Sequence, residues 1–167
     1  LKGNTALERG AAVIRDELRA IGLVMDVVPL EVGALVDRLE KGDFEALYFN
    51  FTMTDLDPAG NLDFWLSSGS AHVWNTLQPQ PATDWERRVD DLIVRMASSV
   101  DDRERKRLFG EVQRVFADQL PILYFAAPRV YVATSARLVN VAPSLIRPMV
   151  LWSADTLAVQ KRAGTSE

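Results

Sequence analysis

Residues 24–51 decide the fold class, and they read VMDVVPLEVGALVDRLEKGDFEALYFNF. The first seven of these residues are rich in β-branched side chains, and Pro29 marks their end, which predicts a strand. Apolar residues then recur at helical spacing until Gly42, which predicts a helix. The nearly uninterrupted apolar run 44–51 predicts a second strand that is covered on both faces. This order predicts a parallel pair of strands joined by a right-handed crossover.

Further helices are predicted on both sides of this unit. Upstream, residues 5–21 carry one apolar stripe, and Thr5 with Glu8 has the spacing of a capping box. Downstream, a short helix is predicted near residues 62–66. An antiparallel helical hairpin follows, and its first helix begins near Thr83 with a second capping-box pattern.

The C-terminal third predicts more extended structure. Residues 122–126 and 130–134 are expected to be strands, and the apolar stretch 139–159 is either a late strand or an arm that packs on another domain. We therefore expect an α/β fold in which residues 1–160 form one domain with a mixed β-sheet flanked by helices. Residues 161–167 are expected to be a disordered tail.

The composition excludes several classes of function. The chain has 167 residues, no cysteine, a single histidine and a formal net charge of -4. Disulfides, thiolate nucleophiles and cysteine-based or two-histidine metal sites are therefore excluded, and we expect neither a metal nor a cofactor. The acidic balance argues against a nucleic-acid partner, and no apolar stretch is long enough to span a membrane. The sequence starts without Met or a secretory signal, so we interpret it as a piece of a longer protein or a processed form.

The long irregular stretch over residues 52–81 is where we expect function, because such loops within a compact domain are unusual. It contains the carboxylates Asp55, Asp57 and Asp63, which suit either acid–base chemistry or, more commonly, the capping of turns. It also contains His72, the one imidazole. Because no nucleophile-elbow pattern surrounds this histidine, we interpret it as a loop residue that caps a turn.

Aromatic residues gather at and after the end of the second predicted strand. Phe49, Phe64 and Trp65 are expected to be core residues, whereas Phe51 and Trp74 suit either the core or a binding surface. Ligands of open α/β sheets bind beyond the carboxyl ends of the strands. Aromatic rings beside turn aspartates at that edge are suited to stack on an apolar group and to accompany a cation.

Several short segments follow one another in the order and spacing of a known family. They are residues 21–23 (IGL) after the first helix, 28–33 (VPLEVG), 39–45 (LEKGDFE), 57–58 (DP), 102–109 (DRERKRLF), Gln113 and 120–124 (LPILY). Together, over most of residues 6–135, they resemble the peptide/nickel-binding family of extracytoplasmic solute-binding proteins. Members of this family are the receptors of ATP-driven (ABC) importers.

This resemblance implies the C-terminal lobe of a two-lobed receptor with the type II periplasmic-binding-protein fold. The receptor would capture a peptide or similar small solute between its lobes, without catalysis, by closing about a hinge. The implied ligand is an oligopeptide or dipeptide, with a sugar as an alternative. The implied protein partners are the N-terminal lobe of the same receptor and the permease of the transporter. The implied location is the periplasm or the cell surface, with the signal peptide outside this segment.

The resemblance also implies site residues. The family's pocket aromatic falls on Phe51, and the aspartate that holds a peptide's amino group falls on Thr54 or, with a one-residue slip, on Asp55. The expected ligand-binding residues are Phe51, Thr52, Thr54, Asp55, Asp57 and Trp74. If Thr54 occupies the aspartate position, a peptide amine loses its partner, and a sugar, another polar solute or a modified peptide becomes the expected ligand.

Two functions of other classes remain open from the sequence. One is a hydrolase-like enzyme domain that uses Asp55, Asp57 or His72 as its acid and base. The other is a structural module that only contacts other proteins. Neither explains the long polar loop after a buried apolar run as well as a binding lobe does.

Overall fold

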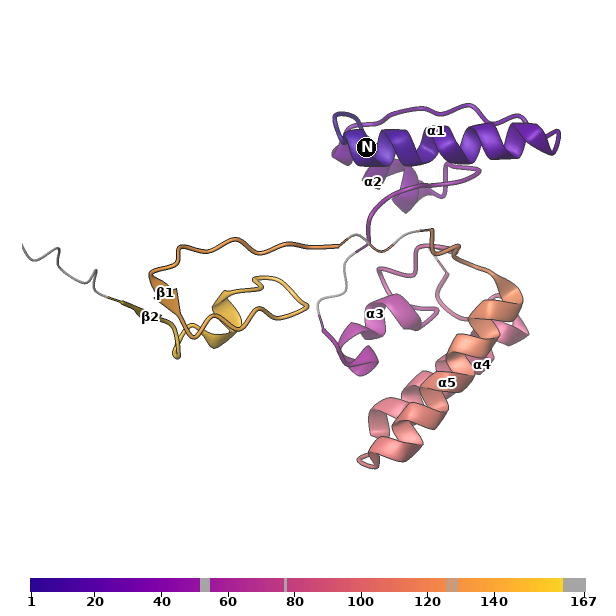
Figure 1. The fold of residues 1–167 in the computed structure, drawn as a ribbon. Coiled ribbons are helices and arrows are strands. Elements are labelled where there is room, and N and C mark those ends of the chain that lie inside the picture. Colours follow the sequence, from indigo (N-terminus) through magenta and orange to yellow (C-terminus); the bar gives the residue numbers. More distant parts are fainter. Residues whose placement is uncertain (52–54, 77, 126, 128, 161–167) are drawn as a thin grey trace, which may run out of the picture.

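The computed structural model of the chain describes residues 1–51, 55–76, 78–125, 127 and 129–160 (Figure 1). Its helices are α1 (Thr5–Ala20), α2 (Val32–Lys41), α3 (Leu62–Trp65), α4 (Asp84–Ser98) and α5 (Asp102–Gln119). Two 3-10 helices, η1 (Pro58–Asn61) and η2 (Leu151–Ser153), and two short strands, β1 (Leu138–Val139) and β2 (Ala158–Val159), are also present. The five helices predicted from the sequence are therefore confirmed.

The ends of the helices test the capping predictions. The capping box at the start of α4 is confirmed, because the Thr83 hydroxyl accepts from the Glu86 backbone N–H and the Glu86 carboxylate accepts from the Thr83 backbone N–H. The box predicted at Thr5 is wrong. The N-cap of α1 is Asn4, and its side-chain oxygen accepts from the backbone N–H of Leu7 at 3.1 Å. Asparagine is as good an N-cap as threonine, and here the helix begins one residue earlier.

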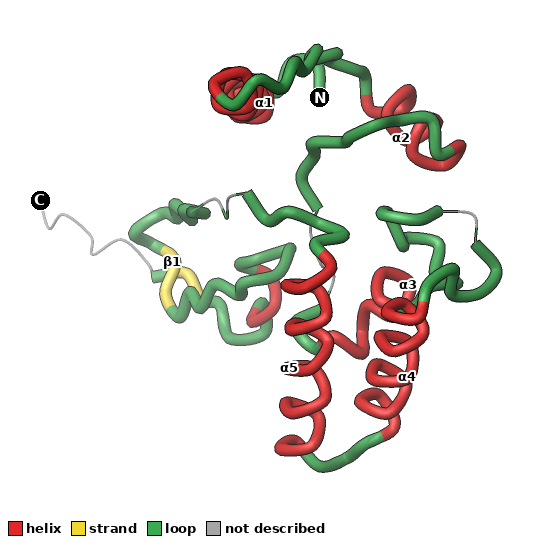
Figure 2. Tube along the Cα trace, turned by 90° about the vertical axis from the view of Figure 1, so that its right-hand side faces the viewer, coloured by secondary structure: helices red, strands yellow, loops and turns green. Residues whose placement is uncertain are grey.

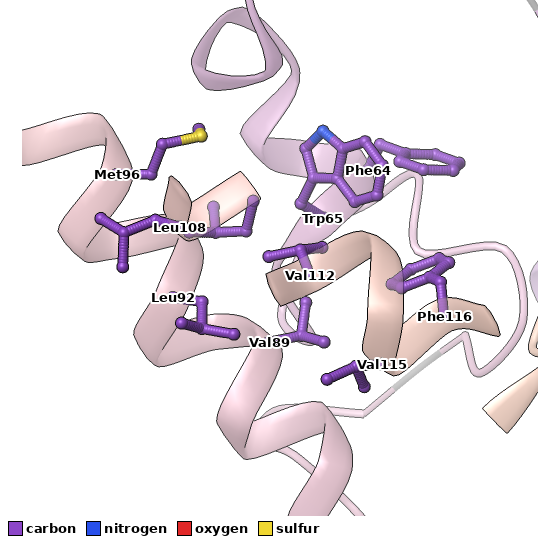
Figure 3. Close-up of a cluster of buried hydrophobic side chains, with 10 residues drawn as sticks. Phe64, Trp65, Val89, Leu92, Met96, Leu108, Val112, Val115 and Phe116 are labelled. Carbon is purple, nitrogen blue, oxygen red and sulfur yellow. The ribbon is translucent and has the colours of Figure 1, made fainter. Parts of the chain in front are cut away.

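The core of the chain is the antiparallel pair of α4 and α5, with α3 packed against α4 (Figure 2). Figure 3 shows side chains from all three helices meeting in one cluster. Its buried members are Phe64, Trp65, Val89, Leu92, Ile93, Met96, Leu108, Val112, Val115 and Phe116. The cluster confirms the core predicted for Phe64 and Trp65, whereas Phe49 is only half-buried and lies outside the cluster.

The mixed sheet predicted from the sequence is not present in the described residues. Segments 24–30 and 44–51, and the described parts of 122–126 and 130–134, run without β-pairing. The pairing that the structure does describe is antiparallel, with Leu138 opposite Val159 in a two-stranded unit. The physical reason is that apolar, β-branched sequence favours extended backbone, but a strand also needs neighbouring strands in register.

The unpaired segments leave large apolar side chains in water. Val24 is 90% exposed, Val28 63% and Tyr131 84%. Segments 44–51 and 122–125 nevertheless approach each other, because the Tyr48 and Phe125 rings meet edge to face with centroids 5.7 Å apart. None of the described helices is long and apolar enough to cross a membrane.

Two valines of α4 test the assignment of the core. Val89 is 1% exposed and Val94 is 52% exposed, on the same helix. We expect Val89→Ala to lower the free energy of unfolding by about 2 kcal/mol, because it removes buried methyl groups and leaves a cavity. Val94→Ala is the matched control and should change it by less than about 0.5 kcal/mol. Urea unfolding followed by circular dichroism measures both, and equal losses would contradict the assigned core.

Candidate ligand-binding site

A hollow of about 430 Å³ opens where the loop after the predicted second strand meets α3. Phe51 contributes from the end of segment 44–51, and the other lining residues come from η1, α3 and the loop that follows. The lining residues are Phe51, Ala59, Gly60, Asn61, Leu62, Asp63, Phe64 and Ala71. Pockets for small molecules commonly measure about 300–1,000 Å³, so this hollow has the size of a small ligand or of part of a larger one.

Aromatic rings form one wall of the hollow. The Phe51 and Phe64 ring centroids lie 4.8 Å apart, with 37° between the ring planes. Phe64 is 3% exposed and is held edge to face against Trp65 and Trp74, whereas Phe51 is 45% exposed. Phe64 is therefore the anchored ring, and Phe51 is the ring that a ligand can reach.

The Asp57 side chain holds the turn beside the hollow. Its carboxylate accepts from the backbone N–H of Ala59 at 3.0 Å and from the Arg105 guanidinium at 2.7 and 2.5 Å. Arg105 also donates to the backbone oxygens of Met96 and Ser99 at the end of α4. Both oxygens of the carboxylate accept from the same guanidinium nitrogen, Nη2, in a charge-assisted contact. Asp57 therefore connects η1 to the α4–α5 hairpin.

Asp55 belongs to the same turn. Its carboxylate accepts from the backbone N–H of Asp57 at 2.9 Å, and its side chain packs so closely on Gly60 that a Cβ there would lie 2.5 Å from it. It lines a second, smaller hollow of about 160 Å³, together with Leu56, Pro58, Asn61, Trp65 and Phe109. This volume lies below the usual range for small-molecule pockets.

Trp74 packs against the core and is not among the residues that line either hollow. Its ring meets Phe64 and Phe116 edge to face, each with centroids 5.2 Å apart, and lies against the His72 ring at 3.9 Å. Of the predicted ligand-binding residues, the structure thus places Phe51 on the larger hollow, Asp55 on the smaller one and Asp57 in an ion pair. Thr52 and Thr54 lie outside the described residues.

The sequence prediction did not include several residues that line the larger hollow. Leu62 and Ala71 are not among the predicted site residues, and the sequence places Asp63 among the loop carboxylates that suit acid–base chemistry or the capping of turns. One signal in the sequence is Gly69, where the loop turns back onto α3. A Cβ at Gly69 would lie 2.1 Å from the backbone oxygen of Asp63, and the same oxygen accepts from the Ala71 N–H at 3.1 Å.

Two carboxylates of α4, the half-buried Asp90 and the buried Glu86, hold the loop after α3 in place. Asp90 accepts from the Ser67 backbone N–H at 2.8 Å and from its hydroxyl at 2.5 Å. Glu86, four residues earlier on the same face, is 1% exposed. Its carboxylate accepts from backbone N–H groups, a hydroxyl and side-chain amides of Asn75, Gln78, Ala82 and Thr83. The backbone beside the hollow is therefore anchored to the hairpin.

His72 is part of the group of side chains that surrounds the Glu86 carboxylate. It is 1% exposed, and its Nε2 lies 3.4 Å from Glu86 Oε1. Burial lowers the pKa of His72 below its ordinary value, although Glu86 acts in the opposite direction. Burial alone would raise the pKa of Glu86, but the hydrogen bonds from Gln78, Thr83 and Asn75 outweigh it and lower that pKa. Burial therefore favours the neutral form of His72, and its position against Glu86 of α4 corrects its interpretation as a simple turn cap.

The described residues contain no group of three or more histidine, cysteine, aspartate or glutamate side chains arranged to hold a metal ion.

Comparison with known proteins finds similar proteins at low identity. No family model matches the sequence. The chain is 28% identical over 148 residues to the di/tripeptide-binding protein 2 of Pseudomonas aeruginosa strain UCBPP-PA14, covering 88% of this chain and 26% of that protein. It is 26% identical over 122 residues to the dipeptide-binding protein of P. aeruginosa strain PAO1, covering 72% of this chain and 22% of that protein. No solved structure matches.

The chain is therefore similar, at low identity, to bacterial proteins named for binding di- and tripeptides. It spans about a quarter of the length of the curated relatives that it matches.

The pH dependence of folding tests the buried state of His72, the single histidine of the chain. An unfolded histidine takes up a proton below pH about 6.5. Because its pKa is lowered in the folded chain, the folded form stays neutral there, and stability present above pH 6.5 is lost as the pH falls toward the folded pKa. We expect the free energy of unfolding to fall by up to about 1.4 kcal/mol per pH unit below 6.5.

The control for this measurement is His72→Gln, which keeps a donor for Glu86 but does not titrate. Urea unfolding at pH 7.5, 6.5 and 5.5 should show a smaller pH dependence in the variant than in the parent chain. Identical slopes in the two proteins would contradict a buried, neutral His72.

Substitution of Gly69 tests how the loop after α3 packs on the turn that contains Asp63. Gly69→Ala places a methyl group against the Asp63 backbone oxygen and should lower the free energy of unfolding by about 1–3 kcal/mol. Gly33→Ala is the control, because nothing lies within 4 Å of its added Cβ in α2. This control should be stabilising by up to about 1 kcal/mol, since alanine is the better helix former. A Gly69→Ala chain as stable as the parent in urea would show that the loop does not pack on α3 in this way.

Proposed function

We propose that this chain is a ligand-binding lobe of an import receptor that captures a peptide or similar small solute without changing it covalently. The observation that supports this most directly is the hollow beside Phe51. It lies next to the one predicted pocket aromatic that is both described and exposed, and it has the size of a small-molecule site. The receptor would belong to an ABC importer and would deliver its ligand to the transporter's permease.

The choice of a peptide ligand rests on the relatives. They are named as di/tripeptide- and dipeptide-binding proteins, and one of the matches covers 88% of this chain. A protein that works this way is exported, to the periplasm or to the cell surface. Residues 1–160 would make up one lobe, the C-terminal one, and the remainder of a longer receptor would supply the other.

The exposed apolar segments fit this proposal. Soluble proteins rarely expose large contiguous apolar surface unless another surface covers it. Segments 24–30 and 130–134 carry exposed apolar side chains on unpaired backbone. In the whole receptor these segments would form the mixed β-sheet that the sequence predicts, which would make the lobe a type II periplasmic-binding-protein fold.

A lobe with an open hollow supplies only one wall of a cleft. Binding by the isolated chain would therefore be weak, because the second lobe cannot close over the ligand. In the whole receptor, closure would remove water from the hollow and add contacts from the opposite wall.

Thermal unfolding of the full-length receptor tests the proposed function. A ligand that binds only the folded state stabilises it by RT ln(1 + [L]/Kd), which is about 2.7 kcal/mol at a hundredfold excess over Kd. We expect members of a panel of di- and tripeptides to raise the Tm by several degrees, and to be recovered intact after incubation.

Oligosaccharides provide the comparison panel. If a sugar stabilises the receptor and no peptide does, the ligand is a sugar and the proposed peptide class is wrong. Cleavage of the peptides would contradict passive capture, and no stabilisation by either panel would contradict a solute receptor.

A further inference from the structure

The wall that η1 contributes to the larger hollow is held from outside the hollow by Arg105. Three of the lining residues, Ala59, Gly60 and Asn61, belong to η1. η1 begins directly after Asp57, whose carboxylate accepts from the Ala59 backbone N–H as its N-cap. Both oxygens of the same carboxylate accept from Arg105 Nη2. One ion pair therefore joins this wall of the hollow to α5.

Arg105 is itself held firmly on the hairpin. Its Nη1 donates to the backbone oxygens of Met96 and Ser99, at 2.7 and 3.1 Å. These oxygens lie at the C-terminal end of α4, where the helix dipole favours a cation. The Arg105 side chain is only 19% exposed, and Met96 is 1% exposed. The guanidinium therefore offers Asp57 a fixed point on the α4–α5 hairpin.

Other hydrogen bonds of the turn act within the turn itself. The Asp57 backbone N–H donates to the Asp55 carboxylate, and Asn61 Nδ2 donates to the backbone oxygens of Asp55 and Asp57. These bonds fix the shape of residues 55–61. Ala59 also packs on the buried cluster, but apolar contact is not directional. The Arg105 pair adds a directed contact between the turn and the hairpin.

We propose, on the basis of the function proposed above, that Arg105 is a positioning residue for ligand binding, which acts through Asp57 to hold the η1 wall of the hollow in place. Neither Arg105 nor Asp57 is among the described residues that line the two hollows. Asp57 thus contributes to binding without touching the ligand. This role differs from the one that the sequence predicts, in which Asp57 is itself a ligand-binding residue.

Three substitutions separate this link from the other roles of the two residues. Asp57→Ser keeps a good N-cap for η1, but serine is too short to reach the guanidinium. Arg105→Met keeps an unbranched side chain and removes both the link and the contacts with α4. Arg105→Lys keeps the charge, but one ammonium group cannot replace the two separate nitrogens. Arg103→Met is the matched control, because Arg103 is exposed on the same helix.

Calorimetric titration of the full-length receptor measures the affinity, with phenylalanyl-glycine and trialanine as probes. We expect Asp57→Ser and Arg105→Met to weaken binding to a similar extent, about tenfold, which is a typical coupling within one hydrogen-bond network. The double variant should bind no more weakly than either single variant, because both substitutions break the same link. Arg105→Lys should fall between the parent and Arg105→Met, and Arg103→Met should bind as the parent does.

Urea unfolding of the same variants gives a readout that separates positioning from stability. Arg105→Met should lower the free energy of unfolding more than Asp57→Ser does, because it also leaves the Met96 and Ser99 oxygens without this donor. Equal losses of affinity beside unequal losses of stability are what positioning predicts. Losses of affinity that follow the losses of stability would overturn the proposal.

Alanine-methyl NMR of the 167-residue chain locates the effect on the hollow. Ala59 lies in η1 and Ala71 lies in the loop that α4 holds, and both line the hollow. We expect Asp57→Ser and Arg105→Met to shift the Ala59 methyl signal and to leave the Ala71 signal in place. An unshifted Ala59 signal in both variants would show that this wall does not depend on Arg105.

Two results of the titrations would also overturn the proposal. One is weaker binding by Asp57→Ser with unchanged binding by Arg105→Met, because Asp57 would then contact the ligand itself. The other is a double variant in which the two losses add. If no peptide stabilises or binds the full-length receptor, the proposed function has failed, and the Ala59 signal alone decides whether Arg105 positions the wall.

Discussion

The packing of Phe64 and Trp65 into the α4–α5 hairpin is the interaction on which the geometry of the site depends. Both rings belong to a helix of four residues, which is too short to be stable through its own hydrogen bonds. α3 is therefore held by the burial of these two side chains. Because Leu62 and Asp63 precede them in the same turn, their positions at the hollow follow from what Phe64 and Trp65 bury.

Carboxylates provide the second constraint, because three of them, Glu86, Asp57 and Asp90, connect separate elements. Burying a charge costs several kcal/mol unless hydrogen bonds replace the lost water. Glu86 meets this condition through donors from the loop over residues 75–83, so the same contacts that solvate the carboxylate also fix the loop. Asp57 and Asp90 likewise connect separate elements. The unpaired acid that lines the hollow, Asp63, is the exception in this part of the chain.

Sequence reasoning found the features that local physics determines. Helical periodicity and the Thr83–Glu86 pair predicted α4 correctly, because capping and an apolar stripe act within a few residues. The strands were predicted from side-chain preference, but the described structure has no sheet there, because pairing depends on partners distant in sequence. The aromatic residues show the same limit. Phe51 and Trp74 were equivalent in the sequence, and tertiary packing places one on the hollow and the other on Phe116.

The exposure of the hollow determines what its charge can contribute. An exposed ion pair is worth about 0–1 kcal/mol, because water and salt screen it. The same pair becomes stronger when solvent is excluded and the effective dielectric constant falls. If a second lobe covers the hollow, any contact between a carboxylate of its wall and a charged group of the ligand would therefore gain strength on closure. A ligand that carries this charge would then favour the closed state over the open state, because its affinity differs between the two. Recognition of the ligand and closure of the receptor would in this way depend on the same contact.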